Sequence, residues 1–126
     1  MSRHFIRAVV LATALTAFAT LAAAEPASKW RLKFDHWAEV DGELVLRIAP
    51  LNGTPIDVST KIAKSTTENA AAELVSGALK AQLGKGYKVE VDDGEDIVIK
   101  KSGKTPKFEV TMVSSSVTGL NVKIKH

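Results

Sequence analysis

The chain has 126 residues, with 17 basic side chains, 14 acidic side chains and no cysteine. Without cysteine it has neither disulfide bonds nor thiolate ligands for a metal, so its stability must come from its hydrophobic core. Acids and bases are nearly balanced, which argues against a general polyanion binder, although the charges are unevenly spread along the chain.

Residues 1–24 are typical of an export signal. Arg3 and Arg7 form a positive n-region, and a stretch of apolar and threonine residues follows at 8–21. Ala22 and Ala24 are small residues at the −3 and −1 positions of a cleavage site. We therefore expect cleavage after Ala24 and a periplasmic or secreted mature protein.

The alternative for this segment is an uncleaved membrane anchor, because residues 8–24 are about as long as the shortest spanning helices. The alanine-rich end, followed by Glu25 and Pro26, favours a peptidase site over a stop-transfer helix. No second apolar run of that length follows, so we expect no membrane span after cleavage.

The expected mature part is residues 25–126. Loss of Arg3 and Arg7 reduces the 17 basic residues to 15 against 14 acidic ones, a net charge of +1. A chain of roughly 100 residues buries about two thirds of its unfolded surface, which is enough for a single domain.

The first elements predicted along the mature chain are two strands. Apolar and polar residues alternate from Trp30 to Trp37, and again from Leu44 to Ile48 until Pro50 ends the run. The pair Asp41-Gly42 between them is a strong turn signal. We therefore expect a β-hairpin, with His36 on the same face as the apolar residues of its strand.

A helix is predicted after a segment whose structure the sequence leaves open. Residues 56–62 could form a short edge strand or a lead into the helix. Ser65 and Glu68 have the spacing of a capping box, and strong helix formers follow until Gly84. The apolar stripe of this helix should lie on a sheet, with Gly77 at a close approach or merely tolerated.

The rest of the chain predicts four more strands. Two alternating runs at 87–91 and 97–99 flank Asp93-Gly94 and predict a second hairpin. Alternating runs at 108–112 and 120–124 predict the last two strands. The expected fold is α+β, a mostly antiparallel sheet of about six strands with one amphipathic helix packed on one face.

No catalytic or metal-binding site follows from these residues, and no cofactor is expected. His36 is a lone histidine among apolar neighbours, which more often packs at a core or edge than binds a ligand. Ser76 lacks the spacing of known nucleophile motifs and is expected on the helix surface. The acids around Gly94 lack the spacing of a calcium loop and suit a solvated hairpin tip.

Binding residues are easier to nominate. Trp37 falls on the same side of its strand as Arg31 and Lys33, where it could anchor a partner or else fold over the edge of the core. Lysines also concentrate in the last third of the chain, and those expected on a second surface are Lys100, Lys101, Lys104 and Lys107. One helix covers one face of a sheet, so the other face is wet or binds a partner.

The sequence thus favours an exported, non-catalytic binding module. Its partner would be an unidentified protein or an envelope component such as a glycan or an anionic lipid, and no nucleic acid. A small periplasmic hydrolase and an envelope structural or assembly subunit are the alternatives, and the oligomeric state stays open.

Overall fold

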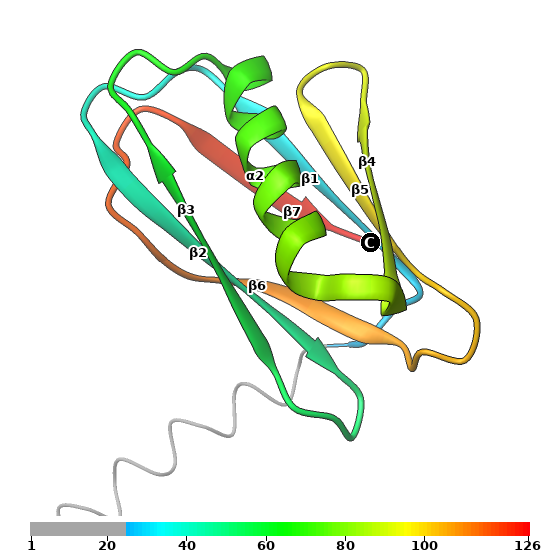
Figure 1. The fold of residues 1–126 in the computed structure, drawn as a ribbon. Coiled ribbons are helices and arrows are strands. Elements are labelled where there is room, and N and C mark those ends of the chain that lie inside the picture. The colour runs from blue at the N-terminus through cyan, green and yellow to red at the C-terminus, as the bar shows by residue number, and fades with distance from the viewer. Residues whose placement is uncertain (1–24) are drawn as a thin grey trace, which may run out of the picture.

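The computed structural model describes residues 25–126, and the predicted export signal lies outside them. These residues form seven strands in two antiparallel sheets and one long helix (Figure 1). The strands are β1 (Lys29–Asp35), β2 (Gly42–Pro50), β3 (Ile56–Ile62), β4 (Tyr87–Asp92), β5 (Asp96–Lys101), β6 (Phe108–Ser115) and β7 (Asn121–Lys125). The helix α2 (Glu68–Leu83) lies between β3 and β4 in the chain and continues into a short 3₁₀ turn, η2 (Gly84–Gly86).

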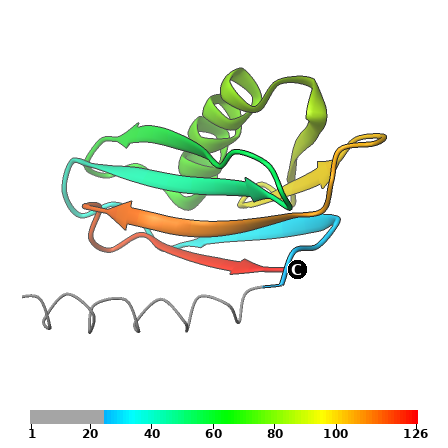
Figure 2. The same cartoon turned by 90° about the horizontal axis from the view of Figure 1, so that it is seen from below.

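The two sheets have the strand orders β4-β5-β1-β7 and β3-β2-β6. A bridge between Ala27 and Phe108 joins their margins, and α2 packs against β3 of one sheet and β4 of the other (Figure 2). The predicted α+β class, with antiparallel strands and one packed helix, is confirmed. The additional strand is β3, in the segment that the sequence left open.

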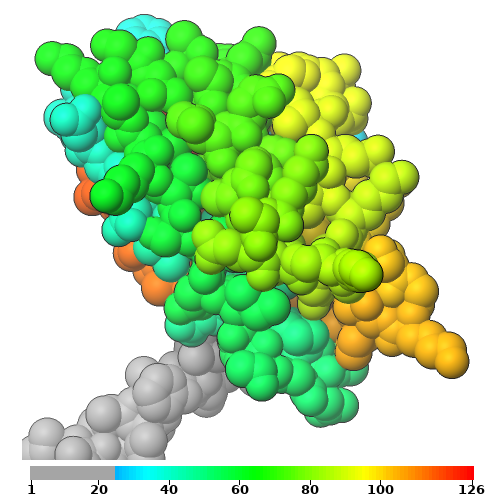
Figure 3. Space-filling view, viewed as in Figure 1, coloured from blue at the N-terminus to red at the C-terminus, as the bar shows by residue number. Residues whose placement is uncertain are grey.

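The hydrophobic core lies between the inner faces of the two sheets and the helix. Leu32 and Phe34 of β1 belong to the same core cluster as Leu46 and Ile48 of β2, and all four side chains are almost completely buried. Val75 of α2 belongs to the same cluster. The space-filling view shows the helix side of the molecule, where α2 covers the strands beneath it (Figure 3). The outer faces of both sheets are thereby left to solvent.

The predicted hairpin of the first two strands is wrong, because β1 and β2 belong to different sheets. Both sides of β1 are occupied by β5 and β7. Asp41 instead accepts a hydrogen bond from the backbone of Lys64, and a Cβ on Gly42 would lie 2.8 Å from backbone atoms of Ser116 and Val117. Glycine is therefore needed here for a close backbone approach.

The helix occupies the predicted residues, although its start differs in detail. Thr67, not Ser65, is the N-cap, and its hydroxyl accepts a hydrogen bond from the Ala70 N–H. The expectation that Ser76 lies on the surface is wrong, since it is buried. A Cβ on Gly77 would meet nothing within 4 Å, so this glycine is tolerated and marks no close approach.

The second predicted hairpin is confirmed as β4 and β5. Asp93 and Gly94 both have positive φ at its tip, which is the conformation that Asp-Gly pairs favour. The tip lies against the first turn of the helix, because a Cβ on Gly94 would be 3.1 Å from Asn69 Nδ2. In the part of the chain that the structure describes, no helix has the length and apolar character needed to cross a membrane.

Candidate functional site

The outer face of the four-stranded sheet carries an excess of positive charge. Along β1 the apolar residues point into the core, so Lys29, Arg31 and Lys33 point outward. The strand registers place further lysines of β4, β5 and β7 on the same side. We call this surface the basic face, and its cationic residues are Lys29, Arg31, Lys33, Lys88, Lys100, Lys123 and Lys125.

Three of these lysines form a row across neighbouring strands. Lys100 of β5 lies directly opposite Lys88 of β4 on one side and Lys29 of β1 on the other. Like charges directly opposite each other in a sheet are destabilising. The row therefore carries a local cost in stability that the fold alone does not require.

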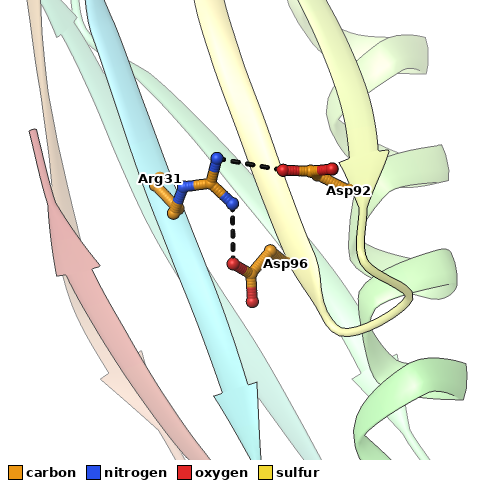
Figure 4. A network of polar contacts seen from close by, with 3 residues as sticks. All are labelled: Arg31, Asp92 and Asp96. Atoms are coloured by element: carbon orange, nitrogen blue, oxygen red, sulfur yellow. Dashed lines mark hydrogen bonds and ion pairs between the residues drawn. The ribbon is translucent and has the colours of Figure 1, made fainter.

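Arg31 binds two of the acids on this face, Asp92 and Asp96. Its guanidinium donates to Asp96 Oδ2 at 2.7 Å and to Asp92 Oδ2 at 3.0 Å, bridging β1 to both strands of the hairpin (Figure 4). Hydrogen bonds to Asp96 and then Asp92 raise the pKa of Arg31 above its ordinary value. Asp96 is buried and its Oδ1 has no hydrogen-bond partner among the described residues.

Most lysines of the basic face are left without a carboxylate. Lys88 lies 3.7 Å from Glu90 Oε2, and Asp92 and Asp96 are bound to Arg31. Within residues 25–126 no carboxylate lies within 4 Å of the ammonium groups of Lys29, Lys33, Lys100, Lys123 and Lys125. These five charges are available to an external anion.

Two hollows flank the outward side chains of β1. One has a volume of about 300 Å³ and lies between β1, β4 and β5, and its wall holds three cationic residues and the acids Glu90 and Asp92; the cationic residues are Lys29, Arg31 and Lys100. The other has about 250 Å³, shares Lys29 and Arg31, and is completed by Lys125 and His126. The His126 ring contacts Trp30, with a centroid distance of 4.7 Å. The basic face is therefore contoured, and cationic groups line both depressions, together with two carboxylates in the first.

A larger hollow, of about 540 Å³, lies elsewhere, where β2 begins and β3 ends. Its charged residues are Asp41, Glu43 and Lys61, so it lacks a dominant sign of charge. Glu43 already binds the Ser59 hydroxyl, and Asp41 accepts the backbone N–H of Lys64. These polar groups serve the local structure and leave little to recognise a ligand.

The predicted binding residues are grouped differently from the two surfaces expected. Arg31 and Lys33 share one face with Lys100, since β1 and β5 are neighbours. Lys101 points to the opposite side and its ammonium donates to the Gly103 carbonyl.

Lys104 and Lys107 lie outside the sheet, in the exposed loop between β5 and β6, which protrudes at the lower right of Figure 3. Trp37 lies beyond the C-terminal end of β1, whereas the lysine row crosses the N-terminal end of this strand, and the Trp37 side chain is 58 % exposed. That these residues bind a partner stays a prediction.

His36 does not share the core face of β1 as the alternation indicated. The strand ends at Asp35, and His36 has a φ of 67° and an exposed side chain. Its Nε2 lies 3.8 Å from Asp35 Oδ2, but it lines none of the three hollows. Catalysis at this histidine, which the hydrolase alternative requires, stays a prediction.

The acids at the β4–β5 tip are not arranged as a cation site. Asp92 and Asp96 are engaged by Arg31, and Asp93 forms the turn. Among residues 25–126, no group of three or more histidine and carboxylate side chains is placed to hold a metal ion.

Sequence reasoning missed Lys29, Lys88, Lys123 and Lys125. Each alternates with buried or half-buried residues of its strand, so each could be predicted to point outward. That β4, β5, β1 and β7 lie side by side, however, depends on pairings between distant segments. No protein-family model matches this chain, and no curated protein matches its sequence.

Proposed function

We propose that this protein is an exported, non-catalytic binding module whose basic face holds an anionic partner in the cell envelope. The single observation that carries the proposal is the row of Lys88, Lys100 and Lys29 in directly opposed positions of three strands. A negative partner would relieve their repulsion, so binding would gain from a strain already present in the free protein.

The shape of the face favours a partner with several negative groups. Four strands spaced about 4.8 Å apart make a surface roughly 14 Å wide, with outward residues about 6.6 Å apart along each strand. The unpaired lysines are spread over β1, β5 and β7. A single small anion would contact only part of this set, whereas a chain of carboxylates or phosphates would contact most of it.

The first experiment measures binding of fluorescent poly-L-glutamate, with poly-L-lysine as the control for the sign of the charge. Replacing Lys29, Lys88 and Lys100 together by glutamine should lower the affinity at least about tenfold and flatten its dependence on salt. The matched control replaces three exposed lysines outside the basic face, Lys61, Lys64 and Lys80, by glutamine. Equal losses in both triple variants, or equal binding of poly-L-lysine, would refute the proposal.

Export is tested separately, because a basic face would also bind anions in another compartment. The full-length chain, expressed in a Gram-negative host, should be recovered from the periplasm or medium with Glu25 as its first residue. Recovery of the intact chain from the cytosol would refute this part of the proposal.

A further inference from the structure

The strand β7 forms one border of the four-stranded sheet and presents an edge with which no other strand of residues 25–126 pairs. Its only strand neighbour among the described residues is β1 (Figure 2). The Phe34 N–H donates to the Glu95 carbonyl, toward β5, so the backbone groups of Arg31, Lys33 and Asp35 point toward β7. Their partners in β7 are the odd-numbered residues. The N–H and C=O groups of Val122 and Ile124 therefore face away from β1.

The two faces of β7 differ in chemistry. Val122 and Ile124 point inward and are half-buried, and both pack against the core cluster, as does Met112 of β6. Lys123 and Lys125 point outward, opposite Lys33 and Arg31 of β1. The inward side chains of a strand added beside β7 would lie next to Val122 and Ile124, and its outward side chains would lie next to Lys123 and Lys125.

A second copy of this chain is a poor occupant of the edge. Two β7 strands paired with each other would bring Lys123 and Lys125 of both copies onto one face, beside Lys33 and Arg31 of both. Like charges at opposed positions repel, and edge lysines are a common means of preventing self-association through a sheet edge. The same lysines attract a strand that carries acids at the matching positions.

We propose that the free edge of β7 binds an extended segment of a partner protein in which acidic and apolar residues alternate. The segment pairs antiparallel with β7, as all strands of the two sheets do. Its apolar residues lie opposite Val122 and Ile124 and exchange backbone hydrogen bonds with them, and its acids lie opposite Lys123 and Lys125. This inference rests on the proposed function, because it assigns the partner of the basic face to a class.

The test uses a capped peptide that alternates valine and glutamate over the length of β7, studied below its self-association concentration. In antiparallel pairing the valine N–H groups point toward β7 and the glutamate N–H groups point away. N-methylation of the valines should weaken binding at least about tenfold, while N-methylation of the glutamates should leave it within about twofold. Equal effects of the two modifications would overturn the proposal.

The charge requirement has its own matched pair of variants. Lys123→Glu combined with Lys125→Glu should abolish binding of the glutamate peptide and create binding of the corresponding valine–lysine peptide. The control, Lys61→Glu with Lys64→Glu, should retain the original preference. Backbone amide shifts in NMR should be largest at Val122 and Ile124, and shifts confined to lysine side chains would contradict strand addition.

Poly-L-glutamate and phosphatidylglycerol vesicles, run in parallel, separate this inference from the proposed function. Binding of poly-L-glutamate to the lysine row without any binding of the peptide overturns the inference alone. Failure of both overturns both. Vesicles that bind and displace the peptide without changing the β7 amides assign the basic face to a lipid surface and also overturn the inference.

Discussion

Neutralising the central lysine of the row should stabilise the protein. In Lys100→Gln the charge opposite both Lys29 and Lys88 is removed. Opposed Cβ atoms lie about 5 Å apart, and for ammonium groups taken to be about 7 Å apart each neighbour would cost about 0.6 kcal/mol in water. Both together amount to about 1 kcal/mol at about 10 mM salt, and to about 0.1 kcal/mol at about 1 M salt.

The assay is thermal unfolding of the wild type and the variant at the two salt concentrations. A gain of about 1 kcal/mol corresponds to a rise in Tm of about 4–8 °C for a domain of this size. The rise should disappear at high salt, and Lys104→Gln, in a loop without an opposed lysine, should show neither effect. Lys100→Gln should also weaken poly-L-glutamate binding. If Lys100→Gln and Lys104→Gln behave alike at low salt, the account of the row fails.

Three further predictions concern the stability of the fold. Gly42→Ala should lower the free energy of unfolding in urea by about 1–3 kcal/mol, because the added Cβ would lie 2.8 Å from backbone atoms. Gly77→Ala should instead raise it by up to about 1 kcal/mol, because the added Cβ would meet nothing within 4 Å. Similar effects of the two substitutions would contradict this. Arg31→Gln should lower the Tm by leaving Asp96 buried without its cation, and Asp96→Asn added to it should restore part of the loss; no restoration would argue against their coupling. The hydrogen bond from Arg47 of β2 lowers the pKa of Asp57. The pair therefore stabilises the folded protein at pH values above the unfolded pKa of this carboxyl, and this contribution is lost as the pH falls through the lower folded pKa. Asp57→Asn should therefore flatten the fall in stability below about pH 4, and an unchanged acid slope would refute this.

Local signals in the sequence predicted the elements that depend on near neighbours. The helix follows from a run of helix formers ended by Gly84, and the β4–β5 hairpin from Asp93-Gly94 between alternating runs. The prediction of a first hairpin was wrong because Asp41-Gly42 gives the same local signal as Asp93-Gly94, while the glycine is present for a different reason. There the glycine is required by contact with Ser116, which lies far away in the sequence.

The candidate site depends on pairings that the sequence does not reveal. Alternation placed Arg31 and Lys33 outward, but the row needs the register of β4 against β5 and of β5 against β1. Trp37 was assigned to the same surface on the assumption that the strand continued through it. The strand ends at Asp35, and the positive φ of His36 breaks the alternation there. The direction of the Trp37 side chain is therefore set by the loop and not by the strand.

The position of β1 also has a consequence for how the polypeptide acquires its structure. This strand is near the start of the described chain, yet its partners β5 and β7 are among the last strands to be synthesised. Until residues near Lys125 have been synthesised, β1 has one strand neighbour at most, and the backbone groups of its other edge stay unpaired. Folding should therefore be slow for a domain of this size and largely post-translational, and an incomplete chain should be prone to aggregate.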